Sequence, residues 1–239
     1  LLAEKIFPAL LKNRDPNDAL RIWVPACASG EETYSIAICL FEYLKERSVR
    51  VPIQIFATDI NERAIEKART GIYSKGSLEN VSPKRLNDYF VQVNDHYQIV
   101  KSIRDVCVFA PHNLLKDPPF SRMDLISCQN VMIYLQNVGQ RKIISTFHFA
   151  LKPLGYLFLG KSETIGNAQE LFTVADKENK IYKRKEGSTN GNFTAQPNNY
   201  YPKEDFPGNR KNLAAAISPN SIDKEIEKLL LSRYIPASV

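Results

Sequence analysis

The sequence contains few of the residues that bind metals or form disulfides. Its 239 residues include four cysteines and three histidines, none at the close spacing of a metal site: Cys27, Cys39, Cys107, Cys128, His96, His112 and His148. Scattered thiols of this kind are typical of proteins kept in a reducing compartment. We therefore predict no metal site, reduced cysteines that are mostly buried, and a cytoplasmic location.

The sequence also has no long apolar run. No stretch approaches the roughly 20 apolar residues that span a bilayer, and the first residues do not read as a signal peptide. The formal net charge of +6 is as compatible with a solvated basic surface as with an acidic partner. We expect a globular protein that is not inserted in a membrane.

The stretch 21–35, RIWVPACASGEETYS, organises the rest of the chain. It predicts a buried strand, a turn of small residues, and a helix that begins at the two acids Glu31 and Glu32. A strand that passes through such a turn into a helix forms a cofactor cradle at the helix N-terminus. A second strand, residues 53–58, ends at Asp59, where an acid suits the hydroxyls of a ribose. Together these features predict a nucleoside-bearing cofactor.

Strands and helices alternate along the chain, which predicts an α/β fold with a doubly wound parallel sheet. Residues 90–100 read as an antiparallel hairpin, and residues 172–174 and 180–182 as a final antiparallel pair. Right-handed crossovers place all strand-to-helix loops at one edge of the sheet. Dispersed polar residues therefore converge at that edge: Gly30, Glu31, Asp59, Asn113, Asn130 and Glu163.

The turn at residues 27–30 contains one glycine and is followed by the acids Glu31 and Glu32. Dinucleotide-binding loops usually contain more glycines, and a phosphate-bearing cofactor favours a loop free of acids. An edge lined by carboxylates suits a cation instead. S-adenosylmethionine carries an ammonium, a sulfonium and a ribose, so the electrostatics favour it over a nicotinamide dinucleotide.

The C-terminal part of the chain has a different composition. Residues 186–219 are rich in Asn, Gly, Pro and Ser with little periodicity, which is typical of a linker. Residues 220–239 contain an apolar stripe at helical spacing. We expect a folded domain over residues 1–185, then the linker, then a helix that leads to a further domain.

Several motifs jointly resemble the chemotaxis-receptor glutamate O-methyltransferases, the CheR-type family: RIWVPACASGEETYSIAI, IFATDINERAIEKARTGIY, PHNLL, SCQNVMIYLQ and LKPLGYLFLGKSE. The resemblance implies a class I S-adenosylmethionine-dependent methyltransferase over residues 1–185. This fold is a Rossmann-like sheet with a small antiparallel β-insertion, here at about 73–110. The implied substrates are glutamate side chains on the cytoplasmic helices of methyl-accepting chemotaxis receptors, and the implied product of the cofactor is S-adenosylhomocysteine.

The resemblance also assigns cofactor-binding positions: Gly30, Glu31, Asp59, Asn113, Leu114, Asn130 and Val131. A receptor glutamate is ionised at pH 7, so methyl transfer to it requires positioning rather than a general base. Bringing two bound reactants into line can supply roughly 7–11 kcal/mol of the barrier. We predict that Arg69, Arg122 and Tyr134 hold the substrate carboxylate.

The sequence departs from the family pattern in two places. Gln129 stands where the family usually has Arg, and the upstream Asn-x-Thr-x-x-x-Arg cofactor motif is not in the chain. The tail resembles the connector to a PAS domain, so we expect the chain to be part of a methylesterase–methyltransferase–PAS hybrid. An inactive methyltransferase-like scaffold within such a hybrid is the alternative. Methylation of nucleic acid is disfavoured, because residues 130–133, NVMI, lack the paired prolines of base-methylating loops.

Overall fold

The computed structural model describes residues 1–186, so the linker and tail helix predicted beyond this point lie outside the described residues. A π-helical turn at Leu2–Ile6 leads into α1 (Phe7–Leu11), and the longer helices are α2 (Glu31–Glu46), α3 (Glu62–Thr70) and α6 (Asn137–Ala150). The strands of the main sheet are β1 (Leu20–Pro25), β2 (Ile53–Asp59), β6 (Cys107–Pro111), β7 (Met123–Cys128), β8 (Leu151–Leu159), β9 (Phe172–Asp176) and β10 (Ile181–Arg184).

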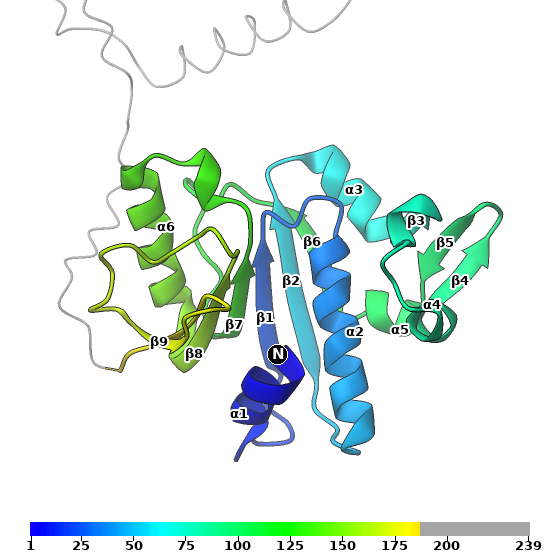
Figure 1. The fold of residues 1–239 in the computed structure, drawn as a ribbon, viewed down its shortest axis with the longest axis horizontal. Coiled ribbons are helices and arrows are strands. Elements are labelled where there is room, and N and C mark those ends of the chain that lie inside the picture. Colours follow the sequence, from blue (N-terminus) through cyan, green and yellow to red (C-terminus); the bar gives the residue numbers. More distant parts are fainter. Residues whose placement is uncertain (187–239) are drawn as a thin grey trace, which may run out of the picture. The chain divides into compact units, whose positions relative to one another are not determined.

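The main sheet has seven strands in the order β6-β2-β1-β7-β8-β10-β9 (Figure 1). Neighbours from β6 to β8 pair in parallel, whereas β10 is antiparallel to both β8 and β9. The predicted doubly wound sheet and its final antiparallel pair are therefore confirmed. The strand order reverses between β1 and β7, where ligands bind in open α/β sheets.

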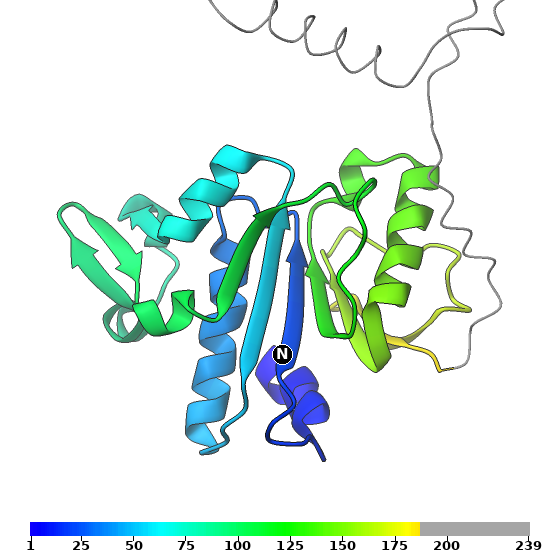
Figure 2. The same cartoon turned by 180° about the vertical axis from the view of Figure 1, so that it is seen from behind.

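Alternate residues of the central strands belong to two separate hydrophobic clusters. Ile22 and Val24 of β1 pack with buried residues of α1, α2 and α3, whereas Trp23 packs with those of α6. As a result, α2 and α6 cover opposite faces of the sheet (Figures 1 and 2). All six residues of β7 are buried, as expected for the central strand of such a sheet.

A second, smaller sheet lies next to α2 and α3 (Figure 1). It contains β3 (Ile72–Ser74), β4 (Phe90–Val93) and β5 (His96–Ile99) in the order β3-β5-β4, with α4 (Pro83–Tyr89) and α5 (Lys101–Arg104). The predicted insertion at 73–110 also included β6, but β6 pairs in parallel with β2 in the main sheet. A short apolar strand carries no sign of which sheet it joins, so the sequence did not show where the insertion ends.

Strand β8 runs from Leu151 to Leu159 through residue types that are typical of turns. Pro153 and Gly155 lie inside β8, where Leu154 has φ 62° and the register with β7 shifts. A Cβ on Gly155 would lie 2.9 Å from the carbonyl oxygen of Lys152. The turn chemistry therefore produces an irregularity within one strand rather than a break before it.

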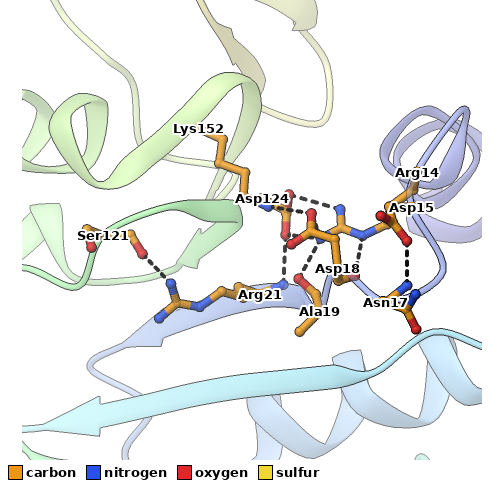
Figure 3. Close-up of polar contacts among 9 residues, drawn as sticks. All are labelled: Arg14, Asp15, Asn17, Asp18, Ala19, Arg21, Ser121, Asp124 and Lys152. Carbon is orange, nitrogen blue, oxygen red and sulfur yellow. Dashed lines mark hydrogen bonds and ion pairs between the residues drawn. The ribbon is translucent and has the colours of Figure 1, made fainter.

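At the N-terminal edge of the sheet, one buried carboxylate binds two cations (Figure 3). Asp124 forms a two-pronged ion pair with Arg14, at 3.0 Å for each of its oxygens. Lys152 Nζ lies 3.2 Å from Asp124 and 3.0 Å from Asp18, and the backbone N–H of Arg21 donates to Asp124 at 2.8 Å. This network joins the segment before β1 to the first residues of β7 and β8.

Two absences apply to residues 1–186. No helix in this range combines the length and apolar character needed to cross a bilayer. Nor does this range contain three or more His, Cys, Asp or Glu side chains arranged to hold a metal ion. Of the free cysteines, Cys27 and Cys128 are buried and Cys39 and Cys107 half-buried.

Candidate functional site

The turn between β1 and α2 contains several residues in the left-handed conformation. Ala26, Ala28 and Gly30 have φ values of 53°, 47° and 91°. A Cβ on Gly30 would lie 3.0 Å from the Cβ of Ala68 in α3, so glycine suits both the backbone conformation and the close approach of α3. The small residues of the turn thus allow α2 to begin directly at the C-terminal edge of β1.

Asp59, at the end of β2, holds this turn in place. Its Oδ2 accepts a hydrogen bond from the N–H of Ala28 at 2.9 Å, and its Oδ1 accepts one from the N–H of Asn61 at 2.8 Å. The N–H of Cys27 donates to the carbonyl of Thr58 at 2.9 Å. Because each carboxylate oxygen has a further lone pair, Asp59 can still accept a hydrogen bond from a ligand hydroxyl.

A cavity of about 160 Å³ opens beside Asp59. Its mainly apolar walls come from α6 and from the loops that follow β1, β2, β6 and β7: Ala26, Thr58, Asp59, Ile60, His112, Asn113, Leu114, Leu115, Val131, Leu135 and Ile143. Four predicted cofactor residues therefore lie together: Asp59, Asn113, Leu114 and Val131. An apolar slot with a carboxylate at its edge suits the base and the ribose of a nucleoside, so these residues fit the predicted cofactor.

The loop after β6 is shaped by its own hydrogen bonds. Asn113 Oδ1 accepts the N–H of Leu115 at 3.0 Å, and the N–H of Asn113 donates to Asp117 at 2.7 Å. The imidazole of His112 packs edge-on against Trp23, with ring centroids 5.6 Å apart. The sequence did not single out His112 or Leu115 for the site, because an apolar or aromatic wall carries no chemical signature in a sequence.

The two acids that begin α2 point to different places. Glu31 accepts a hydrogen bond from the hydroxyl of Ser29 and lines a second cavity, of about 270 Å³, between α2 and the small sheet. Glu32 instead accepts a hydrogen bond from the hydroxyl of Ser127, near the end of β7. Burial raises the pKa of Glu32 to about 7, opposed by the bond from Ser127. Sequence reasoning gave Glu32 no separate role, although Ser127 inside an apolar strand was a signal for it.

The raised pKa of Glu32 predicts that Glu32→Gln removes a loss of stability that the parent undergoes as the pH rises. A folded-state pKa near 7, above the ordinary value, means that burial of the charged form lowers stability as the pH rises from about 5 to above 7. An amide carries no charge at any of these pH values. We expect the unfolding free energy of the variant, relative to the parent, to increase by about 2–3 kcal/mol between pH 5 and pH 8.

Urea unfolding at a series of pH values measures this difference. Glu66→Gln is the matched control, because Glu66 is exposed on α3, and its pH profile should follow that of the parent. Parallel profiles for Glu32→Gln and the parent would contradict the prediction.

The loop after β7 contacts the end of β8. Asn130 is exposed and left-handed, with φ 60°. A Cβ on Gly160 would lie 3.2 Å from both the backbone N and the Oδ1 of Asn130. Buried Glu163 accepts hydrogen bonds from the next two N–H groups, those of Val131 and Met132, at 2.7 and 2.8 Å. The structure thus brings Asn130 and Glu163 to the same edge of the sheet.

The three residues predicted to hold the substrate lie in different places. Tyr134 is 81% exposed, in a 3-10 turn after β7. Arg69 donates through Nε and Nη2 to the carbonyl of Phe109, at 3.1 and 2.8 Å, so part of its guanidinium holds α3 on β6. Arg122 immediately precedes β7 and lies at the N-terminal edge, a full strand length from the cavity. Its predicted role is therefore corrected, because the sequence could not show on which side of β7 the loop at Arg122 would lie.

The strand order, the antiparallel final hairpin and the cavity where the order reverses define a class I S-adenosylmethionine-dependent methyltransferase fold. The profile of the family described as "CheR methyltransferase, SAM binding domain" matches residues 1–181. The chain therefore belongs to this family, whose cofactor is S-adenosylmethionine.

The chain is similar in sequence to chemotaxis protein methyltransferases of several bacteria. It is 34% identical over 177 residues to chemotaxis protein methyltransferase 2 of Vibrio cholerae, which covers 72% of this chain and 61% of the relative. The chemotaxis protein methyltransferase of Escherichia coli K12 is 36% identical over 178 residues, 70% of this chain and 60% of the relative. The chain thus spans less than two thirds of either relative.

Two further matches differ in kind. An uncharacterized 104.1 kDa protein of Rhodobacter capsulatus is 38% identical over 182 residues, which is 76% of this chain but 19% of that protein. Among solved structures, the crystal structure of the DszA carbon methyltransferase is 18% identical, covers 64% of this chain and 31% of that chain, and has a TM-score of 0.40.

Proposed function

We propose that this chain binds S-adenosylmethionine at the C-terminal edge of its sheet and transfers the methyl group to glutamate side chains of chemotaxis receptors, in the cytoplasm. The observation that supports this most is Asp59 beside an apolar cavity where the strand order reverses, in a chain of the CheR family. The names of the Vibrio cholerae and Escherichia coli relatives support the same reaction.

In this proposal, different residues of the site bind different parts of the cofactor. Asp59 binds the ribose hydroxyls, and the cavity walls at Leu114 and Val131 enclose the base. The turn at Gly30 lets the cofactor approach the backbone, and Glu31 at the start of α2 favours its cationic end. The bound cofactor supplies a methyl group on a sulfonium.

The receptor glutamate needs no general base, because its carboxylate is ionised at pH 7. The work of this chain is then to orient that carboxylate and exclude water. Tyr134, 81% exposed beside the cavity loop, is the residue we propose to position it. Exposed Ile60, Ile133 and Val138, at 70, 59 and 70%, follow β2 and β7. Such apolar side chains suit an amphipathic receptor helix.

Two measurements on the 239-residue chain test this function. Calorimetry with S-adenosylhomocysteine should show one binding site, and labelled S-adenosylmethionine should transfer its methyl group to membranes that contain receptors. Receptors with Gln in place of the methylated Glu, in a strain that lacks the deamidase, are the control and should stay unlabelled. Binding without methyl transfer would favour the scaffold alternative, and no binding would contradict the proposed site.

A further inference from the structure

Glu163 is a buried carboxylate with no cationic partner among residues 1–186. It is 3% exposed, yet none of the salt bridges within residues 1–186 involves it. Burying a carboxylate is unfavourable unless hydrogen bonds to the charged form replace those from water. The presence of Glu163 in the loop after β8 therefore has a reason other than charge pairing.

Backbone N–H groups from two loops take the place of water around Glu163. Its Oε1 accepts hydrogen bonds from Val131 at 2.7 Å and Met132 at 2.8 Å, and its Oε2 accepts one from Gly160 at 2.7 Å. Val131 and Met132 follow β7, whereas Gly160 follows β8. One side chain thus joins the loops at the ends of two adjacent parallel strands.

The junction between these loops has little free space. A Cβ on Gly160 would lie 2.8 Å from Oε2 of Glu163 and 3.2 Å from the backbone N of Asn130. Asn130 is itself left-handed, with φ 60°, a conformation that a residue other than glycine adopts seldom and that its surroundings must maintain. Gly160 and Glu163 are among the groups that surround the Asn130 turn.

A second carboxylate lies close to the same loop. Glu32 accepts a hydrogen bond from Ser127, near the end of β7. Burial raises the pKa of Glu32, the hydrogen bond from Ser127 lowers it, and the negative charge of Glu163 raises it further. Both carboxylates are near the end of β7, but it is Glu163 that binds the loop carrying Asn130 and Val131, through Oε1.

We propose that Glu163 is a positioning residue of the cofactor site: its carboxylate fixes the turn at Asn130 and Val131 against Gly160. Val131 is thereby kept in the cavity wall beside Asp59, and Asn130 is kept exposed at the edge of the sheet. This inference rests on the proposed function, because the site that Glu163 supports is the proposed cofactor site. Glu163 acts through the backbone, since its oxygens already bind three N–H groups.

Amide hydrogen exchange of Glu163→Gln tests the junction without any ligand. The variant is nearly isosteric, but its NH2 group replaces a carboxylate oxygen. At least one backbone N–H that donates to the carboxylate then faces another donor. We expect the amides of Val131, Met132 or Gly160 to exchange at least about 10-fold faster, while amides in the centre of β1 keep their rates. Glu170→Gln, an exposed change in the same loop, should alter none of them. Unchanged exchange at all three amides in Glu163→Gln overturns the proposal.

The affinity for S-adenosylhomocysteine tests the positioning role. It is measured by calorimetry under conditions in which circular dichroism shows that all variants are folded. We expect Glu163→Gln to bind about 10- to 100-fold more weakly than the parent, the range for buried donors that lose an acceptor, and Glu170→Gln to bind like the parent. A purely structural role would lower the melting temperature and leave this affinity unchanged.

The outcomes separate the positioning role from the proposed function. Equal affinity in Glu163→Gln and the parent overturns the positioning role while the function stands, whereas a parent chain that does not bind S-adenosylhomocysteine overturns the function. If Glu163→Gln does not fold, Gly160→Ala decides, because its Cβ perturbs the same junction without changing the charge. We expect at least about 5-fold weaker binding for Gly160→Ala, and unchanged binding overturns the positioning role.

Discussion

Asp124→Asn is expected to lower the free energy of unfolding by about 3–5 kcal/mol, the range measured when one partner of a buried ion pair is removed. Asp124 and Arg14 have side chains only 6% and 8% exposed, and Lys152, at 19%, lies 3.2 Å from the same carboxylate. Without the charge of Asp124, both cations remain largely buried and share the half-exposed Asp18.

The cost is expected to be large because Asp124 also binds backbone. Its Oδ2 accepts the N–H of Arg21, the second residue of β1. An amide in its place can keep some of these acceptor contacts but presents its NH2 group to a guanidinium or an N–H. As Figure 3 shows, the network links the segment before β1 to β7 and β8. Its loss should therefore destabilise the central strands.

Urea unfolding monitored by circular dichroism measures this loss. Asp88→Asn, an exposed change on α4, is the matched control and should stay within about 0.5 kcal/mol of the parent. Because the network lies at the N-terminal edge of the sheet, the affinity of folded Asp124→Asn for S-adenosylhomocysteine should equal that of the parent. A stability loss below about 1 kcal/mol would show that the pair is screened like a surface salt bridge.

The order of elements was predictable because each depends on local chemistry. The apolar run at β7 and the small-residue turn before α2 carry their signals within a few residues. Gly71 follows α3 in the left-handed conformation, with φ 61°, as a glycine at a helix end commonly does. Ser82 and Pro83 begin α4 with a cap that is local in sequence, Ser82 accepting the N–H of Arg85.

What the sequence could not supply was the pairing of distant segments. The assignment of β6 to the main sheet depends on parallel contacts with β2, and the extension of β8 depends on its register with β7. Likewise, the different directions of Glu31 and Glu32 follow from where Ser29 and Ser127 lie in space. Two adjacent acids at the start of a helix look alike in the sequence, whichever side chain each of them contacts in the fold.

Asp59→Ala is expected to weaken the binding of S-adenosylhomocysteine by about 100-fold or more, since hydrogen bonds to a charged group contribute about 1.5–3 kcal/mol each and a ribose offers two hydroxyls. The carboxylate is half-buried at the edge of the cavity. It is already oriented by the N–H groups of Ala28 and Asn61, so little ordering remains for the ligand to induce.

The same contacts predict a second effect that must be separated from the first. Loss of the carboxylate leaves the N–H groups of Ala28 and Asn61 without this acceptor, so Asp59→Ala should also lose about 1–3 kcal/mol of stability. Calorimetry at a temperature where the variant is fully folded isolates the affinity, and Asp95→Ala, exposed in the β4–β5 turn, is the control. If folded Asp59→Ala bound S-adenosylhomocysteine as tightly as the parent, Asp59 would be only a support of the turn. The nucleoside would then have to lie elsewhere on the sheet edge.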